Sequence, residues 1–554
     1  MIHNIHWLAS VPSVDDWYQV LPEEYVGPMS ATFKIVDLFA GPGGLAEGFA
    51  AFRDDTGKAP FKIALSVEME ANAFQTLRLR SFFRQFETAP QEYYDYVAGR
   101  VDKSALVAAH ASEWNAAVTE TKQLTLGTED AKLAIDPILD KLRSGTDPTI
   151  LIGGPPCQAY SLVGRSRNRG IEGYDPAKDH RHFLYREYIR IIQRLQPAAF
   201  VMENVKGILS SKVGGDLIFH RVLKDLKEAG GAEESYTLLP LVKAERGRGS
   251  GFIVRCEDFG IPQCRHRVII VGVRTDLLDK EMSQLAFAGL EPFIQATPAS
   301  TVLKAMPKLR SGLTPAREDN AENWTEAAVQ GMRKAADAAR AAGQSLEEVA
   351  TLLESIAEET AADVKGFPRK SSELAKIKDN RLGAWLADPN LDTLPNHETR
   401  GHMRDDLARY AFVSAFGSIF GRSPKANEFP SDLAPDHANW KTGKFADRFR
   451  VQLWDRPSTT VTSHISKDGH AFIHPDPAQC RSLTVREAAR LQTFPDNYFF
   501  EGGRTAQFTQ VGNAVPPLLA QQIAAVLHSL IGSHSVDNED EPQNDGTARE
   551  VEST

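Results

Sequence analysis

Lys34-Ile-Val-Asp-Leu-Phe-Ala-Gly41-Pro-Gly43-Gly44 is the stretch that decides the fold of this chain of 554 residues. Its first half is mostly apolar, which predicts a strand over 34–39 that is buried on both faces, as in a parallel sheet. Its second half is rich in glycine and leads into a predicted helix. Glycine at such a turn lets the main chain approach a bound cofactor closely. The stretch has neither a GxGxxG pattern nor a phosphate-binding lysine, which favours a nucleoside cofactor that needs no pyrophosphate cradle.

Four further apolar runs predict strands, and stretches with helical spacing lie between them. Strands that alternate with helices predict a doubly wound α/β domain with a mostly parallel sheet. Glu68, at the end of the second strand, is an acid in the position where such folds bind ribose hydroxyls. The four strands are expected over 61–68, 149–154, 198–203 and 268–273.

The alternation of strands and helices is interrupted twice, which indicates a division into parts. Residues 71–148 form a long insert of helical character, and the alternation is lost from about residue 286 to about residue 475. The true start of the chain, at Met1 or at Met29, stays open. The predicted parts are an N-terminal extension, a catalytic domain, a second domain, a C-terminal return to the catalytic domain and a disordered acidic tail, over 1–30, 31–285, 286–475, 476–535 and 536–554.

The composition is that of a soluble globular protein. The chain is 42% hydrophobic and 25% charged, and it has no apolar run long enough to predict a membrane-spanning helix. The spacing of its four cysteines fits neither a zinc site nor a disulfide framework, which indicates a reducing cytoplasm. The net charge of −10 comes from the two ends, because residues 1–30 carry −4 and residues 536–554 carry −6. An acidic total therefore does not exclude a polyanionic partner.

Chemically reactive side chains follow the predicted strands directly. Cys157 comes after the third strand, in a loop that prolines stiffen, and the arginines that follow favour its thiolate form. Glu203 ends the fourth strand. Gln263, Arg265 and Arg267 lead into the fifth, and alternation puts these three side chains on one side of an extended chain. The sequence therefore predicts a nucleophile, an acid and a pair of arginines near the edge of the sheet where such folds bind ligands.

Six segments together resemble the motif set of the DNA (cytosine-5) methyltransferases, the bacterial Dcm-like family. They occur in the family's order, and the match spans 35–274 and about 450–530. The unmatched region between the fourth and fifth segments lies where the family has its target recognition domain. The resemblance implies an S-adenosylmethionine-dependent, Rossmann-like fold with a second, irregular recognition domain. The six segments lie at 37–44, 153–158, 203–205, 263–271, 481–496 and 510–517.

The resemblance implies a covalent mechanism, because C5 of cytosine is a poor nucleophile. By position, Cys157 matches the thiolate that adds to C6 and makes C5 nucleophilic. Glu203 matches the carboxyl group that holds the ring near N3 and the 4-amino group. Arg267, supported by Arg265, matches the arginine that stabilises the charge developing at O2. The family flips the target cytosine out of the duplex, and this chain is expected to do the same within a specific double-stranded sequence.

The resemblance also assigns two larger sets of residues and no metal ligands. Glu68 is expected to hold the ribose of S-adenosylmethionine, and Met69 to lie against the adenine. The loop over 161–173, with its arginines, is expected to close over the DNA. The cofactor is expected to bind at Phe39, Ala40, Gly41, Gly43, Gly44, Glu68, Met69, Pro155, Asn513 and Ala514. DNA contacts are expected from Gln158, Ser161, Arg165, Arg167, Gln263 and Thr460.

One departure from the family concerns the acid that binds the adenine amino group on the third strand. The insert obscures this acid, and Asp102 is the candidate. Two alternative functions stay open. A tRNA cytosine-5 methyltransferase of the same fold has a small recognition region and a Cys-Phe-Thr segment, which this chain lacks. A non-catalytic DNA-binding relative is expected to have lost Cys157, Glu203 or the cofactor glycines.

The expected partners follow from the leading interpretation. They are double-stranded DNA and, within a restriction–modification pair, a separately encoded restriction endonuclease. The protein is expected to be a monomer in a bacterial cytoplasm, associated with the nucleoid through DNA and not with a membrane.

Overall fold

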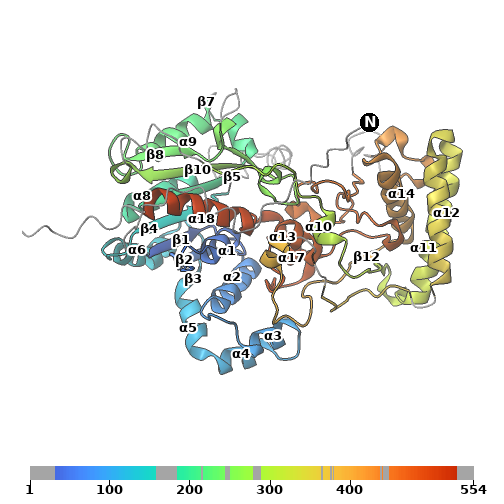
Figure 1. Cartoon of the computed structure of the whole chain (residues 1–554), viewed down its shortest axis with the longest axis horizontal. Coiled ribbons are helices and arrows are strands. Elements are labelled where there is room, and N and C mark those ends of the chain that lie inside the picture. The colour runs from blue at the N-terminus through green and yellow to red at the C-terminus, as the bar shows by residue number, and fades with distance from the viewer. Residues whose placement is uncertain are drawn as a thin grey trace, which may run out of the picture.

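The described part of the chain is built around one eight-stranded sheet, with a group of long helices at the other end of the molecule (Figure 1). The computed structural model describes residues 32–156, 184–213, 216–243, 250–278, 289–363, 366–374, 377, 380–436, 440 and 448–532. The strands lie in the order β3-β2-β1-β4-β5-β10-β8, and β9 pairs with β10. They are β1 Phe33–Leu38, β2 Phe61–Glu68, β3 Thr121–Gln123, β4 Thr149–Gly153, β5 Ala199–Val205, β8 Tyr236–Pro240, β9 Ile253–Arg255 and β10 His266–Arg274.

The five strands from β3 to β5 are parallel, β10 runs antiparallel to β5, and β8 runs antiparallel to β10. The strand order reverses between β1 and β4, because the chain proceeds from β1 to β2 on one side and from β4 to β5 on the other. In such folds ligands bind in the crevice outside the carboxyl ends of the strands at this point. Leu38 and Gly153 pair at these ends and mark the crevice. The predicted doubly wound α/β fold is confirmed.

Helices cover both faces of the sheet, as uninterrupted apolar strands require. Ile35 is buried in the core on one face and its neighbour Val36 in the core on the other. Alternate residues of one strand thus serve two cores. The first core includes α1 Gly44–Ala51, α10 Ser300–Leu303, α16 Val485–Leu491 and α18 Pro517–Ile531. The second includes α6 Glu129–Arg143, α8 Leu184–Leu195 and α9 Ile218–Lys227.

The C-terminal helices α17 (Arg504–Asn513) and α18 complete the sheet domain from the far end of the chain. A Cβ atom at Gly48 in α1 would lie 2.4 Å from the Cβ of Ala520, so glycine allows α18 to pack directly on α1. The stretch Arg504–Ile531 is long and apolar enough, by length and composition alone, to cross a membrane, but 67% of its most apolar window is buried inside the protein. Its apolar side chains belong to the first core.

A separate hydrophobic cluster lies at the other end of the molecule (Figure 1) and draws its members from Leu313 to Cys480. Three long helices, α11, α12 and α14, pack against one another around it. Residues between 290 and 306 instead belong to the first core of the sheet domain. The elements of this part are β11 Gly312–Leu313, α11 Ala321–Ala342, α12 Glu347–Ala362, β12 Gly401–His402 and α14 Arg404–Phe420. Leu382 and Leu386 of α13 (Asn380–Leu386) belong to the first core instead.

The insert predicted over 71–148 is shorter in the structure, because both its ends belong to the sheet domain. α2 (Ala71–Phe83), β3 and α6 are parts of the βαβ sequence. The addition proper is a group of three short helices (lower part of Figure 1), which share a small core with Leu79 and Phe82 of α2, with Leu391 and with Phe499. The hydroxyl of Tyr94 donates to Asp388 at 2.7 Å, and that of Tyr96 to Glu501 at 2.8 Å. The three helices are α3 Gln91–Val97, α4 Lys103–Ala109 and α5 Ala111–Glu120.

Candidate active site

The glycine-rich turn follows β1 and turns sharply into α1. Phe39, Gly41 and Gly43 have φ angles of +55°, +57° and +100°, in the left-handed region that glycine adopts without strain. A Cβ atom at Gly44 would lie 2.3 Å from the carbonyl oxygen of Val515, whereas one at Gly41 would have no heavy atom within 4 Å. The turn is therefore packed against the C-terminal segment on one side and has open space beside Gly41 on the other.

Glu68, at the carboxyl end of β2, is bound to this turn. One carboxylate oxygen accepts the N–H of Gly41 at 2.8 Å and the other accepts the N–H of Glu70 at 2.7 Å. Burial raises the pKa of Glu68, while these N–H groups favour its charged form and oppose the rise. The next side chain, Met69, is 58% exposed. A large apolar group beside a held carboxylate fits a ligand that combines a flat ring with hydroxyl groups.

The end of β4 carries the loop that leads to the predicted nucleophile. The side-chain amide of Asn204 in β5 donates to the carbonyl of Pro155 at 3.2 Å and holds this loop. A Cβ atom at Gly154 would lie 2.8 Å from a carboxylate oxygen of Glu203, so the loop passes close over that acid. Five predicted site residues lie outside the described residues: Cys157, Gln158, Ser161, Arg165 and Arg167.

Glu203 and Arg267 form an ion pair at the carboxyl end of β5. Oε1 of Glu203 lies 2.7 Å from Nε of Arg267, and the two side chains are 13% and 11% exposed. The guanidinium also donates to the carbonyl of His266 at 2.9 Å. An arginine and a carboxylate in contact, both largely buried, hold a fixed geometry. These two predicted residues are thus brought together beside the loop of Gly154.

Gln263 and Arg265 lie elsewhere. Both are completely buried. Arg265 donates to the carbonyls of Val461, Gly512 and Ala514 at 2.8, 3.2 and 2.7 Å. This placement differs from the prediction, which put Arg265 beside Arg267 at the substrate. It also leaves Gln263 no surface to offer to DNA, contrary to the prediction. Both side chains contact the segment of Val461, as expected if they lie on one side of the chain, but the C-terminal segment covers that side.

The remaining predicted residues are divided between the surface and the interior. Asn513, the last residue of α17, is exposed, and Ala514 after it is buried. The hydroxyl of Thr460 donates to the carbonyl of Cys264, so it is engaged within the protein. This contact does not favour the predicted role of Thr460 at DNA.

Asp102, the predicted acid for the adenine amino group, lies at the start of an added helix and not on a strand of the sheet. Its side chain accepts the N–H of Ala105 at 2.9 Å and caps α4, one of the added helices. The third strand is β3, which the sequence analysis missed, and Gln123 at its end pairs in register with Glu68. The side chain of Gln123 is exposed at the same edge of the sheet as Met69. Three residues, Thr-Lys-Gln, carry no apolar period from which a strand could be predicted.

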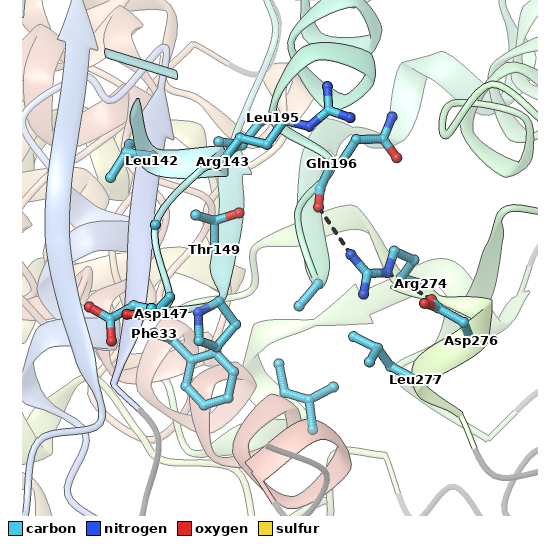
Figure 2. A pocket seen from close by; sticks show the side chains of 15 residues that line it. Phe33, Leu142, Arg143, Asp147, Thr149, Leu195, Gln196, Arg274, Asp276 and Leu277 are labelled. Carbon is cyan, nitrogen blue, oxygen red and sulfur yellow. Dashed lines mark hydrogen bonds and ion pairs between the residues drawn. The ribbon is translucent and has the colours of Figure 1, made fainter. Parts of the chain in front are cut away.

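A cavity of about 660 Å³ lies at the opposite edge of the sheet (Figure 2). Phe33 and Thr149, the first residues of β1 and β4, line it. Arg274 beside it pairs with Asp276 at 2.7 Å. Because ligands of doubly wound folds bind at the carboxyl ends of the strands, this cavity is not the candidate site. Within the described residues, no group of three histidine, cysteine or acidic side chains has the arrangement of a metal site.

Known proteins resemble this chain over most of its length. The family model for the C-5 cytosine-specific DNA methylase matches residues 109–529. Type II methyltransferase M.Bpa9945I of Bacillus paralicheniformis is 33% identical over 522 residues, which are 90% of this chain and 99% of that protein. Type II methyltransferase M.DdeI of Desulfomicrobium norvegicum is 27% identical over 502 residues, with 89% and 87% covered. DNA (cytosine-5-)-methyltransferase M.ApeKI of Aeropyrum pernix is 25% identical over 423 residues, with 70% and 82% covered.

The family model covers most of the chain, and the first of these relatives is aligned over nearly all of both proteins. The chain belongs to the C-5 cytosine-specific DNA methylase family and is an enzyme of the DNA (cytosine-5-)-methyltransferase class.

Proposed function

We propose that the protein transfers a methyl group from S-adenosylmethionine to C5 of a cytosine flipped out of a specific sequence in duplex DNA. The observation that carries this proposal is the meeting of two groups of residues at one edge of the sheet. The glycine turn and Glu68 lie at the ends of β1 and β2. The Glu203–Arg267 pair lies at the end of β5, beside the loop that leads to Cys157.

The residues at the end of β5 account for activation of the cytosine. Cys157, a prediction from the sequence, adds as thiolate to C6, and the electron pair of the C5–C6 double bond moves towards C5 and the N3–O2 side of the ring. O2 is bonded to C2, the ring atom next to N3, so a carboxyl group and a guanidinium in contact with each other fit this edge of the base together. Arg267 stabilises the charge at O2, and Glu203 holds N3 and the 4-amino group.

The residues at the ends of β1, β2 and β3 fit the cofactor. S-adenosylmethionine, when bound, supplies an electrophilic methyl group. Glu68 accepts hydrogen bonds from the ribose hydroxyls, and Met69 covers one face of the adenine. Gln123 takes the place predicted for Asp102, because its amide oxygen can accept from the 6-amino group while its NH₂ donates to N1. The main chain of Phe39, Ala40 and the three glycines, together with Pro155, Asn513 and Ala514, encloses the rest.

The biological setting follows from the printed names of the relatives. M.Bpa9945I and M.DdeI are type II methyltransferases, and we infer that this enzyme protects cytoplasmic DNA within a restriction–modification pair, as a monomer beside a separate endonuclease. Arg165 and Arg167 bind the phosphate backbone next to the flipped base. We assign the recognition residues to the helical part around α11, α12 and α14, because these helices lie in the region of the chain between the fourth and fifth segments.

The test is expression of the wild type and of Cys157→Ala in a host that lacks cytosine methylation, followed by bisulfite sequencing of the host DNA. Cysteine-dependent protection of cytosines at one short recurring sequence is the expected result. Protection in both strains alike would refute the role of Cys157. Absence of protection in both would refute DNA as the substrate, and labelled methyl transfer to tRNA would then be measured.

A further inference from the structure

Gln263 and Arg265 belong to the segment that leads into Arg267, yet neither faces the catalytic edge. Both side chains are completely buried, and they contact stretches from the C-terminal part of the chain, among them those of Val461 and Leu491. Burial of a guanidinium is costly unless its N–H groups are bonded. In Arg265 the acceptors are main-chain carbonyls rather than a carboxylate, and these carbonyls belong to two separate segments.

The first of these segments is the turn at the end of α17. Arg265 donates through one nitrogen to the carbonyls of Gly512 and Ala514, the residues on either side of the exposed Asn513. Gln492 donates to the carbonyl of Val511 at 2.7 Å and to that of Ala514 at 3.3 Å. The two side chains thus bind three carbonyls of one short turn and fix its conformation.

The second segment is the one around Val461. Gln263 and Arg265 form hydrogen bonds with the main-chain N–H and the carbonyl of Val461, respectively. The oxygen of Gln263 accepts the N–H of Val461 at 2.7 Å, and Arg265 donates to its carbonyl at 2.8 Å. The amide nitrogen of Gln263 donates to the oxygen of Gln492 at 2.9 Å. Gln263, Arg265 and Gln492 therefore form one connected buried network, here called the clamp.

The turn held by the clamp is packed against the glycine turn. The carbonyl of Val515, next after Ala514, is the atom that a Cβ at Gly44 would meet at 2.3 Å. A Cβ at Gly512 would lie 2.2 Å from the nitrogen of Ser463, so the same turn is also in close contact with the segment that follows Val461. A shift of this turn by a fraction of an ångström would therefore displace Gly44.

We propose that Gln263, Arg265 and Gln492 are positioning residues of the cofactor site, which act by holding the turn of Asn513 against the glycine turn and not by contact with the cytosine. This inference rests on the proposed function. It gives Arg265 and Arg267, two residues apart, separate roles: Arg267 acts on the base and Arg265 on the shape of the cofactor pocket.

The two roles can be measured separately, because addition of the thiolate to the base needs no cofactor, whereas methyl transfer does. Addition of the Cys157 thiolate to C6 forms the S–C6 bond and makes C5 basic, so C5 takes a proton from water. Loss of the hydrogen originally on C5, followed by elimination of the thiolate, restores cytosine. DNA labelled with tritium at C5 thus releases tritium to water without S-adenosylmethionine.

The experiment measures this release and the steady-state methyl transfer in Arg265→Lys, Arg267→Lys and Gln492→Met. For Arg265→Lys and Gln492→Met we expect tritium release near the wild-type rate and a KM for S-adenosylmethionine raised about tenfold or more, since each loses bonds to the turn. For Arg267→Lys we expect release and transfer to fall together. Arg143→Lys is the matched control, because Arg143 lies on α6 beside the distant cavity.

Loss of tritium release in both clamp variants would overturn the proposal, because it would place the clamp at the base or make it a general requirement for folding. An unchanged KM would overturn it as well. Gln492→Met keeps the size of the side chain and removes no charge, so it serves where Arg265→Lys does not fold. Absence of both reactions in the wild type would instead refute the proposed function.

Discussion

The carboxylate of Glu203 lies 2.7 Å from Nε of Arg267, across the antiparallel pair of β5 and β10. Because β10 runs antiparallel to β5, its first residues lie beside the last residues of β5. A parallel neighbour of β5 would instead place its first residues at the opposite edge of the sheet. The reversal of β10 thus brings residues 64 positions apart in the sequence to one point.

Removal of either partner should abolish most of the methyl transfer. Glu203→Gln retains the size of the side chain but loses the charge that holds Arg267, and we expect kcat/KM to fall by about 10²–10⁴-fold. Arg267→Lys should fall by about 10²–10³-fold, because a lysine cannot form the same planar contacts. Radiolabelled methyl transfer to DNA measures both. A loss below fivefold in either variant would contradict the assignment of the pair to the reaction.

Gly41→Ala should weaken cofactor binding more than it weakens the fold. Gly41 and Gly57 both have positive φ angles, +57° and +80°, and at both a Cβ atom would have no heavy atom within 4 Å. Each alanine variant should therefore lose about 1–2 kcal/mol of stability from backbone strain. Only Gly41→Ala should also raise the KM for S-adenosylmethionine, by about tenfold. Equal KM values in the two variants would show that the space beside Gly41 is not the cofactor site.

Gln123→Ala should raise the KM for S-adenosylmethionine, because two hydrogen bonds to the adenine are lost. We expect an increase of about tenfold, with kcat little changed, since the adenine is remote from the reacting methyl group. Gln193→Ala, an exposed glutamine on α8, is the control. If Gln123→Ala behaves like this control, another residue recognises the adenine.

The protein should lose stability as the pH falls from 6.5 towards 4. Burial lowers the pKa of His397 and of His474 to about 4 each, so both are neutral in the folded state and are protonated first in the unfolded chain. The unfolded state then binds more protons, and stability falls with falling pH throughout this window, by on the order of 3 kcal/mol for His397 alone. Thermal unfolding across the pH range, with His397→Gln as the comparison, measures this. An identical pH slope in the variant would contradict the assignment.

Tyr94→Phe should destabilise the contact between the added helices and the rest of the protein. It removes the 2.7 Å hydrogen bond to Asp388, and a lost bond to a charged partner costs about 1–3 kcal/mol. Calorimetry should show a lower midpoint than for wild type and for Tyr185→Phe, which loses only an exposed contact at 3.5 Å. A melting midpoint equal to that of the control would mean that the Tyr94–Asp388 hydrogen bond does not contribute to the stability of the protein.

Local pattern predicted the sheet well, because its strands are apolar on both faces. The strand predicted over 61–68 agrees with β2, and those over 34–39 and 149–154 agree with β1 and β4 within a residue at either end. β3, β8 and β9 escaped prediction. β3 is short and polar, and without it the only candidate for the adenine amino group was Asp102. A strand of this kind is recognised only from its neighbour, here β2, to which it adds hydrogen bonds.

The candidate site was predictable where the chemistry lies in the segment itself, as for Glu68 and Glu203. It was not predictable where long-range packing decides the environment. The spacing predicts one common side for Gln263, Arg265 and Arg267, but only the contacts with Val461 and Ala514 show that the first two are buried away from Arg267. Burial of this kind depends on contacts across about 200 residues, for which alternation along one strand holds no information.

The position of α18 in the first core has a consequence for biosynthesis. The strands β1, β2 and β4 leave the ribosome early, while the helix that covers one of their faces is the last element of the described chain to be made. Until then the nascent chain exposes an apolar sheet face, which is the kind of surface that chaperones bind and that aggregates. Translation stopped before α18 would leave this face of the sheet uncovered.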